Sequence, residues 1–384
     1  MNSLQSLLKP IPQSPISDAE LTAHSQRPLN NSCNSRQLSF RRFRIRCSIA
    51  DTVDRTFDAP VLGSSQVLER LRASRENQEN QPQFLAMYSS VVGGITTDPA
   101  VMVIPIDDHM VHRGHGVFDT AAIVDGHLYE LDQHLDRILR SASMAKINLP
   151  VSYDREKIKN ILIRTASASK CRNGQLRYWL SAGPGNFLLS TSGLHQSALY
   201  AIVIQGKPPS PPKGIKVITS SIPMKPPQFA TMKSVNYLPN VLSNMEAEEK
   251  GAYTAIWLDS EGFIAEGPSM NVGFITKDKE FLMPHFDKIL SGCTAKRIIT
   301  LAERLVTEGR LRSIRFENLT MEEGKKAEEM VLIGSGVLVS PVLQWDEQII
   351  GDGREGPLAR ALVDLIIEDM KSGPPTVRIR VPYE

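Results

Sequence analysis

Long apolar runs and paired cysteines are both missing from this sequence. No stretch approaches the roughly 18 to 20 apolar residues that a membrane-spanning helix needs, so the sequence predicts no transmembrane segment. Only four cysteines occur among 384 residues, and Cys33 and Cys47 lie in an N-terminal segment of unusual composition. Cys171 and Cys293 alone cannot form a disulfide framework or a four-ligand metal site. We therefore expect no membrane partner and no structural metal.

Acidic residues are nearly absent from residues 1–50, where only Asp18 and Glu20 stand against seven lysines and arginines and nine serines. Four of the arginines cluster at 41–46. This composition is typical of an organelle transit peptide, and the stretch IRCS at 45–48 is similar to plastid processing sites. We expect a transit peptide at 1–47 and a plastid address, with the mitochondrion as the alternative. A basic tail that binds nucleic acid is the competing interpretation.

The positive charge of the chain belongs to that N-terminal segment. The whole sequence has a formal net charge of +2. Without residues 1–50, lysine plus arginine falls from 44 to 37 and aspartate plus glutamate from 42 to 40, which leaves a net charge of about −3. A slightly acidic body gives no electrostatic support to nucleic-acid binding, so we expect no nucleic-acid partner.

Residues 48–205 divide into a polar extension and a first folded region. The extension, 48–81, carries one expected helix at 64–74. Strand patterns follow at 83–92, 176–182 and 198–205, and Asp125 with Gly126 between apolar arms predicts a tight hairpin. The segment 131–146 places Leu131, Leu135 and Ile138 on one helical face with Ala142, and a second helix is expected at 154–169. The sequence thus predicts a smaller N-terminal α+β domain at 82–205.

A proline-rich stretch, GKPPSPPKG at 206–214, separates this region from the rest of the chain. Its four prolines lack amide donors and cannot continue a helix or a central strand, so it is the expected linker. A strand pattern at 215–221 and helical patterns at 240–250, 294–308 and 357–371 predict a larger C-terminal domain at 215–384. The fold class is therefore α+β in two domains.

Lys233 stands in an uncharged stretch, TMKSVNYLPN at 231–240. A lysine amine becomes a useful nucleophile when its surroundings lower its pKa, and small or apolar neighbours are typical of such a site. A surface lysine with a buried stem fits the same pattern. Downstream, Glu266 precedes a Gly-Pro break and is either a solvated loop charge or a buried acid with a cationic partner. Asn271 alternates with the apolar residues around it, as on a strand.

Four motifs in order carry a resemblance to a known family. They are Lys233 with Asn236 and Tyr237, the pattern EG-x-x-x-N-x-x-F at 266–274, SGCTAKRIITLAERL at 291–305, and MVLIGSG at 330–336. Together they resemble the fold-type-IV pyridoxal-phosphate enzymes, which include branched-chain aminotransferases, D-amino-acid transaminases and aminodeoxychorismate lyases. The resemblance spans about 82–371 and is nearest to the plastid branch with D-amino-acid transaminase and lyase activity. It implies a two-domain α+β fold, pyridoxal 5'-phosphate as cofactor, and a homodimer.

The resemblance also assigns roles to individual residues. Lys233 would bind the cofactor as an imine and then serve as acid and base on the substrate carbon. Glu266 would pair with the pyridine nitrogen, because a protonated ring is the stronger electron sink, and Tyr237 would contact the phenolic oxygen. The residues expected around the cofactor and its phosphate are Arg137, Asn271, Cys293, Thr294 and Ser335.

Substrate residues are expected in RGHGVFDT at 113–120 and QLRYWLSAG at 175–183. His115 stands where D-amino-acid transaminases and lyases often have aspartate, and Asp119 where branched-chain enzymes have glutamate. Thr120 lies near a threonine of the lyases. Arg177 resembles the arginine with which branched-chain enzymes bind a substrate carboxylate, although a strand-exposed charge would fit as well.

Several activities remain compatible with these motifs. D-amino-acid transamination to 2-oxo acids is the leading interpretation, together with a lyase activity that releases pyruvate and 4-aminobenzoate from aminodeoxychorismate for folate synthesis. Branched-chain transamination is the enzymatic alternative, and a catalytically idle, cofactor-binding regulatory protein is the alternative of another class. Two weaker patterns also occur. GDGREG at 351–356 spells a dinucleotide-binding motif without room for that fold, and the histidines at 109, 112 and 115 lack the further ligands that a metal site needs.

Overall fold

The computed structural model describes residues 59–76, 83–194, 196–207, 210–212 and 214–383. Residues 61–384 form one compact unit. The expected transit peptide lies outside the described residues, as does the polar extension apart from 59–76. The expected helix at 64–74 is observed as α1 (Ser64–Glu76). Among the described residues, no helix is both long and apolar enough to cross a membrane.

The first sheet is antiparallel, with seven strands in the order β15-β4-β3-β5-β6-β1-β2. Its strands are β1 (Phe84–Ser89), β2 (Gly94–Thr96), β3 (Gly116–Val124), β4 (His127–Tyr129), β5 (Gly174–Ser181), β6 (Ala198–Gln205) and β15 (Arg378–Arg380). The predicted hairpin joins β3 to β4. Asp125 and Gly126 have φ angles of 48° and 76°, which are the left-handed angles that a two-residue hairpin turn requires at both positions.

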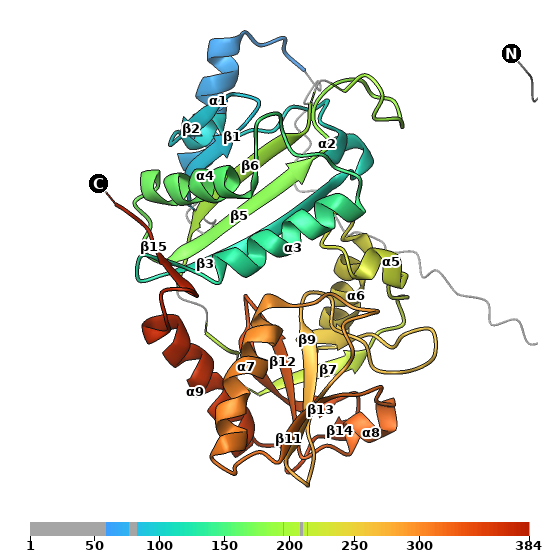
Figure 1. Ribbon diagram of the computed structural model, residues 1–384. Coiled ribbons are helices and arrows are strands. Elements are labelled where there is room, and N and C mark those ends of the chain that lie inside the picture. The colour runs from blue at the N-terminus through green and yellow to red at the C-terminus, as the bar shows by residue number, and fades with distance from the viewer. Residues whose placement is uncertain (1–58, 77–82, 195, 208–209, 213, 384) are drawn as a thin grey trace, which may run out of the picture. The chain divides into compact units, whose positions relative to one another are not determined.

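The long helices of the first half cover one face of this sheet, whereas residues around its short helices pack against the other face, with Met87, Trp179 and Tyr200. The short helices are η1 (Pro99–Val101) and α2 (His109–Arg113), and the long ones are α3 (Leu131–Met144) and α4 (Arg155–Ala168). The predicted apolar face of α3 is buried, with Leu131, Leu135 and Ile138 fully enclosed. These side chains share a core with β3, β5 and β6, and Figure 1 shows α3 lying along the first sheet.

The second sheet is mixed and has the strand order β11-β10-β9-β12-β13-β7-β8, with β14 paired to β13. Its strands are β7 (Ile215–Thr219), β8 (Thr254–Ile256), β9 (Asn271–Ile275), β10 (Glu280–Met283), β11 (Ser313–Phe316), β12 (Glu329–Gly334), β13 (Leu338–Trp345) and β14 (Gln348–Ile349). Its helices are α5 (Pro227–Ala230), α6 (Leu238–Glu249), α7 (Cys293–Thr307), α8 (Met321–Lys325) and α9 (Pro357–Ser372).

One hydrophobic core joins the two halves of the chain. It contains residues of α7, α9, β12 and β13 together with Ala122, Val124 and Tyr129 from the first sheet. The helices α7 and α9 lie beside each other against the second sheet (Figure 1). The first sheet therefore packs against the second half of the chain through this shared core.

The α+β fold class predicted from the sequence is confirmed, and all six expected helices are observed within two residues at each end. The domain division stays a prediction. The described residues of 206–214 carry no helix or strand and lie between β6 and β7, which belong to different sheets. One feature differs from the expected boundaries, because β15 near the C-terminus pairs with β4 in the first sheet.

Candidate active site

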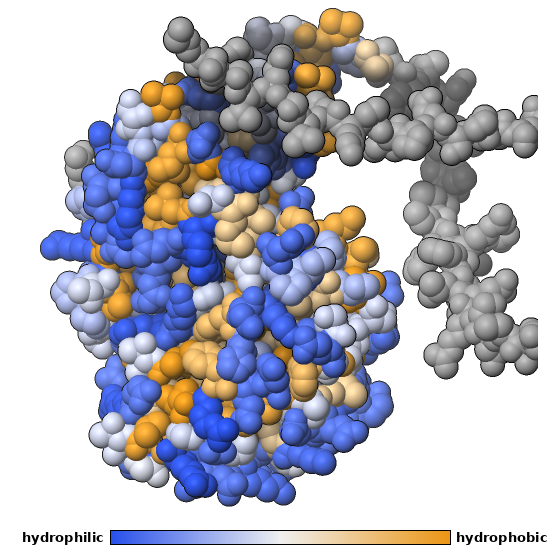
Figure 2. Space-filling view, turned by 45° about the vertical axis from the view of Figure 1, so that its right-hand side comes forward, coloured by the Kyte–Doolittle hydropathy of each residue, from blue (hydrophilic) through white to orange (hydrophobic). Residues whose placement is uncertain are grey.

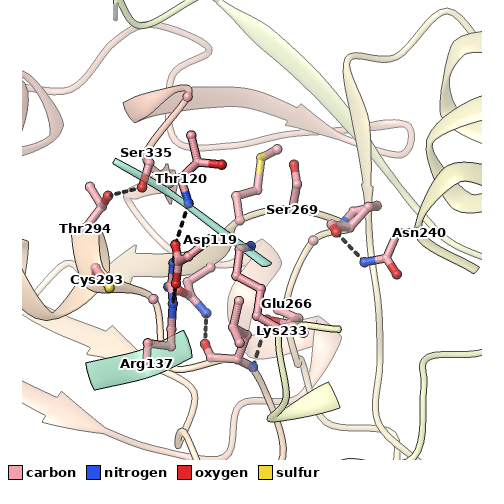
Figure 3. A pocket seen from close by; sticks show the side chains of 18 of the residues that line it. Asp119, Thr120, Arg137, Lys233, Asn240, Glu266, Ser269, Cys293, Thr294 and Ser335 are labelled. Atoms are coloured by element: carbon pink, nitrogen blue, oxygen red, sulfur yellow. Dashed lines mark hydrogen bonds and ion pairs between the residues drawn. The ribbon is translucent and has the colours of Figure 1, made fainter. Parts of the chain in front are cut away.

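A cavity of about 350 Å³ lies between the two sheets. Side chains enter it from β3, β5 and α3, from the segment 225–240, and from the loops at 266–271, 290–294 and 333–336. Figure 3 shows how several of these side chains converge on the cavity. The volume is in the range of small-molecule and cofactor sites, and all four sequence motifs border it.

The backbone on both sides of Lys233 is fixed by the first half of the chain. Phe118 N on β3 donates to the carbonyl of Lys233 at 3.0 Å, and Lys233 N donates to Ser141 Oγ on α3 at 3.2 Å. The side-chain amine donates to Tyr237 Oη at 3.2 Å and lies 4.8 Å from the centre of the Phe118 ring. The amine therefore faces an aromatic wall and a phenol inside the cavity, and not bulk solvent.

Glu266 is buried beneath the same cavity. Its backbone pairs with Trp257, whose amide donates to the Glu266 carbonyl at 2.9 Å, and its Oε2 accepts from Leu290 N at 3.1 Å. No lysine, arginine or histidine among the described residues forms an ion pair with it. Burial raises the pKa of Glu266 to about 8, although the Leu290 amide and the nearby lysines act in the opposite direction. A buried carboxyl without a cation is a suitable partner for a positively charged N–H group.

Arg137 on α3 is held in place by Asp119 on β3. Its Nε and Nη2 donate to the two carboxylate oxygens of Asp119 at 2.8 and 2.7 Å, and His134 Nδ1 lies 2.7 Å from Asp119 Oδ1. Burial would raise the pKa of Asp119, but Arg137 and His134 hold it far below its usual range. Burial would also lower the pKa of His134, yet Cys293 and Asp119 raise it to about 9. Arg137 and His134 thus both contact one buried carboxylate at this end of the cavity.

The N-terminus of α7 faces the same end. Its N-cap, Gly292, makes no side-chain capping bond, so the first amides of this 15-residue helix are available to an anion. Thr294 Oγ1 lies 3.2 Å from Ser335 Oγ, in the glycine-flanked turn after β12. A Cβ at Gly292 would collide with Asn271 Oδ1, and the same Asn271 donates from Nδ2 to the Leu290 carbonyl at 2.9 Å. The turn therefore needs glycine, and Asn271 braces it.

The three expected substrate residues do not all reach the cavity. Thr120 and Arg177 line it from opposing positions of β3 and β5, and Arg177 Nε donates to Thr120 Oγ1 at 3.2 Å. His115 does not line it. Its Nε2 lies 2.8 Å from the Ala145 carbonyl, and its Nδ1 lies 3.1 Å from Nδ1 of His109. The structure thus gives no substrate contact to His115, because its ring is directed into local hydrogen bonds with another histidine and a carbonyl.

Sequence reasoning missed several side chains of the cavity. Lys225, Gln175, Ser269 and Met270 line it, and the sequence marks Asp119 only as a departure from the family pattern. One signal exists for Lys225, since it is a single lysine in an uncharged stretch, SIPMKPP at 221–227, as Lys233 is in its own. No comparable sequence signal distinguishes Gln175 or Ser269 from ordinary surface residues.

The weaker sequence patterns belong to other parts of the fold. The motif at 351–356 precedes α9, whose first amides are already bound by the carboxylate of Glu329, with Leu358 N at 3.1 Å from Oε1 and Ala359 N at 2.5 Å from Oε2. That helix start therefore has no place for a phosphate. Among the described residues, no cluster of three histidine, cysteine or acidic side chains is arranged to hold a metal ion.

The groups in the cavity fit pyridoxal phosphate. A lysine amine next to a phenol, a buried carboxyl without a cation, and a cationic helix start with hydroxyl donors are the functional groups that its aldehyde, ring nitrogen and phosphate would need. Gly292 allows Asn271 to pack against the helix start, because a Cβ at position 292 would collide with Asn271 Oδ1.

Comparison with known proteins shows which family this chain is similar to. The model of the family described as "Amino-transferase class IV" matches residues 116–345. A D-amino-acid transaminase of Arabidopsis thaliana, named as chloroplastic, is 64% identical over 91% of both chains. A putative branched-chain-amino-acid aminotransferase of Methanocaldococcus jannaschii is 27% identical over 67% of this chain and 88% of its own.

Solved structures agree on the fold. A branched-chain amino acid aminotransferase of Thermobaculum terrenum, in its pyridoxal-phosphate form, superposes with a TM-score of 0.66 at 20% identity, and the match covers 79% of this chain and 100% of that one. At such identity the likeness concerns the fold alone. The matched family segment includes Lys233, Glu266, the α7 N-terminus and Ser335, so the chain belongs to the class IV aminotransferases.

Proposed function

We propose that this chain is a pyridoxal-phosphate-dependent transaminase that moves the amino group of a D-amino acid to a 2-oxo acid. The observation that carries the proposal is the Lys233 amine, which lies 3.2 Å from Tyr237 Oη in the same cavity as the buried, unpaired Glu266. The preference for D-amino acids rests on the 64% identity to the Arabidopsis D-amino-acid transaminase. The cofactor also agrees with the pyridoxal-phosphate form of a solved structure of the same fold.

Each group of side chains in the cavity has its own proposed role. Arg137, the α7 amides and the hydroxyls of Thr294 and Ser335 would hold the phosphate. Glu266 would supply a negative charge for the ring nitrogen. Pyridoxal phosphate, when bound, supplies the electron sink that makes the substrate's α-proton acidic.

Proton transfer falls to Lys233. Its Nζ is the basic atom that can take the α-proton from a substrate in the cavity, and the hydrogen bond to Tyr237 Oη orients it. The ring of Phe118, 4.8 Å away, shields the amine from water. A partly desolvated amine with one fixed partner suits an acid and base that must both accept and release a proton.

The test is amino transfer by the purified protein. We expect D-alanine and 2-oxoglutarate to give pyruvate and glutamate, and the visible absorption of the bound cofactor to change on addition of D-alanine. The Lys233→Ala variant should lose both responses while it keeps its fold by circular dichroism. If D-alanine, L-leucine and other amines all leave the spectrum unchanged, the idle regulatory protein would replace the transaminase.

A lyase activity on aminodeoxychorismate is a second candidate. Thr120, which lies near a lyase threonine in the sequence resemblance, lines the cavity and accepts a hydrogen bond from Arg177. Pyruvate release from aminodeoxychorismate without any 2-oxo acid would support it. Branched-chain transamination has weaker support, because the relatives that carry that name are 27–29% identical.

We also propose that the protein forms a homodimer and is located in the plastid. A homodimer is supported by apolar side chains exposed in a stripe along α6, namely Leu238, Val241, Leu242 and Met245, at the i, i+3, i+4 and i+7 spacing of one helical face. Figure 2 shows apolar residues breaking the mainly hydrophilic surface. A plastid location is supported by the chloroplastic Arabidopsis relative, whereas the mitochondrial alternative has no such support.

A further inference from the structure

Cys293 carries a buried thiol that the proposed mechanism does not use. Its side chain is 3% exposed and lines the cavity together with Arg137 and Thr294, as Figure 3 shows. Cys171, the other cysteine that the structure describes, is 5% exposed. Its Sγ donates to the carbonyl of Asn173 at 3.0 Å, and it does not line the cavity. The chain thus has one buried thiol at the cavity and a second, equally buried thiol away from it.

A buried imidazole contacts the thiol of Cys293. The ring of His134 on α3 forms a hydrogen bond with the Cys293 side chain, and its Nδ1 lies 2.7 Å from Asp119 Oδ1. Burial would lower the pKa of His134, yet Cys293 and Asp119 raise it to about 9, so the imidazole is a cation at neutral pH. A sulfur next to a histidine that a carboxylate orients is the arrangement typical of nucleophilic cysteines.

The backbone at Cys293 surrounds the sulfur with further donors. Cys293 is the first residue of α7, whose N-cap, Gly292, makes no side-chain capping bond, so the first amides of the helix bring partial positive charge to this position. Arg137 lies near as well. Burial would lower the pKa of its guanidinium, but Asp119 and Cys293 raise it. A negatively charged sulfur at Cys293 therefore has two cations and a helix start around it.

An independent feature of this region is a phenol without a hydrogen-bond partner. Tyr178 on β5 pairs with Asp119 on β3 in the register of the first sheet and is fully buried, and its hydroxyl has no partner among the described residues. Burial raises the pKa of Tyr178, and the nearby Asp119 and Cys293 act in the same direction. Asp119 already accepts from Arg137 and His134. A buried hydroxyl in this state is unfavourable, and an oxygen atom on the Cys293 sulfur would give it an acceptor.

We propose that Cys293 is a site of reversible oxidation by small hydroperoxides, with His134 as proton donor and Tyr178 as the residue that binds the added oxygen. The sulfur anion attacks one peroxide oxygen, and the S–O bond forms as the O–O bond breaks. The leaving hydroxide takes a proton from His134 and becomes water. Sulfur is oxidised by two electrons to a sulfenic acid, and the peroxide is reduced by two. Two molecules of a small thiol reverse the change, with a disulfide and water as products.

Oxidation of Cys293 and binding of the cofactor exclude each other, because both use the start of α7. An oxygen atom on the sulfur takes up space and donors that the phosphate would use there, and a bound phosphate covers the thiol. Peroxide therefore lowers the cofactor affinity until a thiol reductant restores it. This part of the inference rests on the proposed function, whereas the oxidation of Cys293 does not.

The first test compares the two buried cysteines within one molecule. The full chain is treated with hydrogen peroxide before and after loading with pyridoxal phosphate, catalase removes the excess, and the chain is unfolded in urea with dimedone, which reacts with sulfenic acid. Unfolding exposes both cysteines, so peptide mass spectrometry reports oxidation and not access. Without cofactor, we expect Cys293 to be oxidised about 10-fold or more faster than Cys171 and dithiothreitol to restore its thiol. Equal rates at the two cysteines would overturn the proposal.

Two variants test the partners of the thiol. Tyr178→Phe removes a hydroxyl that has no partner, so the unoxidised protein should keep its stability, but the yield of sulfenic acid should fall about 3-fold or more in favour of sulfinic acid, which dithiothreitol does not reduce. Tyr253→Phe, at an exposed phenol outside the cavity, is the matched control and should behave as wild type. His134→Gln should slow the oxidation of Cys293 about 10-fold.

The variants can also refute the assignment. Oxidation of Cys293 that proceeds alike in wild type, Tyr178→Phe and His134→Gln would overturn the proposal, because neither partner would act on the sulfur. If His134→Gln does not fold, Tyr178→Phe and the rate ratio of Cys293 to Cys171 in wild type decide the question.

The cofactor-loaded sample tests the mutual exclusion. At about 10 times its Kd, pyridoxal phosphate should slow the oxidation of Cys293 about 10-fold, because only the free protein reacts, and should leave Cys171 unaffected. Cofactor binding, seen in the visible absorption, without any protection of Cys293 would overturn the exclusion. A protein that binds no cofactor would instead reject the proposed function, and the comparison of Cys293 with Cys171 would still report on the oxidation site.

Discussion

At the scale of single residues, two ionisable side chains of the cavity, Glu266 and Lys233, form no ion pair with any of the described residues. Glu266 has a carboxyl group buried to 6% exposure, with one amide donor and no cation. Lys233 has an amine whose hydrogen-bond partner is a phenol. Neither arrangement stabilises the protein by itself, because a buried ionisable group without compensation is unfavourable. Such residues are retained at sites where a ligand supplies the missing group.

Glu266 makes the stability of the cofactor-free protein depend on pH. Its pKa is about 8 in the fold against an ordinary 4.5, so the folded protein binds the proton more tightly than the unfolded chain. The stability that this gives is present below about pH 4.5 and is lost as the pH rises through 8. In urea unfolding without cofactor, wild type should lose stability between pH 5 and pH 8.5 relative to Glu266→Gln.

Addition of pyridoxal phosphate should reduce that loss in wild type, because a protonated ring nitrogen would favour the charged carboxylate. Parallel pH curves for wild type and Glu266→Gln without cofactor would contradict the interpretation.

The residues that sequence reasoning found share one property. Lys233, Glu266, the helix start at 293–294 and Ser335 lie in short motifs whose spacing alone makes them recognisable, and all line the cavity. Gln175 could not be found in this way, because its position at the cavity depends on which face of β5 the second half of the chain covers. Lys225 has only the weak signal of a single lysine in an uncharged stretch. His115 was misplaced for the related reason that its motif reaches the site region but its ring turns toward Ala145.

At the scale of elements, one buried ion pair joins β3 and α3 at the end of the cavity where we propose that the phosphate binds. Asp119 on β3 accepts two hydrogen bonds from Arg137 on α3, and His134 one turn earlier contacts the same carboxylate. The strand thus fixes the direction in which the helix presents its arginine. A cation oriented in this way is prepared for a phosphate before the ligand arrives.

Removal of the Asp119 charge should therefore affect both stability and cofactor binding. Asp119→Ala leaves two buried cations unpaired, so we expect the free energy of unfolding to fall by about 3–5 kcal/mol and the affinity for pyridoxal phosphate to fall as Arg137 loses its orientation. Chemical denaturation and a cofactor titration measure the two effects. Asp132→Ala on the same helix breaks half-exposed ion pairs and should change stability by about 1 kcal/mol or less.

A second element-scale device is the carboxylate of Glu329, which caps α9 from strand β12 through the amides of Leu358 and Ala359. Glu329→Ala should lower the free energy of unfolding by about 1–3 kcal/mol, the cost of unsatisfied helix amides. Because Glu329 does not line the cavity, kcat per folded molecule should be unchanged. A loss of activity without loss of stability would contradict this account.

Helices α3 and α7 were predictable because each has a clear apolar face over several turns, and the ends of the expected helices were correct within two residues. The second sheet was less predictable, since strands such as β8 and β14 contain only three and two residues and carry no clear alternation. Pairing between distant segments, such as β13 with β7 in parallel, is set by the whole fold and leaves no local signal.

At the scale of the whole molecule, a polar cluster of Tyr129, Arg297 and Asp369 joins the two halves of the chain in addition to the shared core. Tyr129 at the end of β4 donates to Asp369 on α9, and Arg297 on α7 donates to the same carboxylate at 2.8 and 2.5 Å. This cluster connects the first sheet to α7 and α9, which pack against the second sheet. It therefore supports the cavity that lies between the sheets.

The α6 stripe predicts the state of assembly. Replacing Leu238 and Val241, which are 67% and 50% exposed, by glutamate places charges in the proposed dimer contact, where desolvation is costly. Light scattering coupled to size exclusion should show a dimer for wild type and a monomer for the double variant. Val151→Glu, at an equally exposed apolar residue elsewhere, should remain dimeric, and a monomeric wild type would refute the prediction.

The pairing of β15 with β4 has a consequence for the order of biosynthesis. Residues 378–380 supply the edge strand of a sheet whose other six strands are complete by residue 205. A nascent polypeptide emerging from the ribosome thus leaves the β4 edge uncovered until residues 378–380 have been translated, and an uncovered edge invites pairing with other chains. Chaperone protection of the growing polypeptide is accordingly valuable during the whole interval in which residues 206–377 are being made.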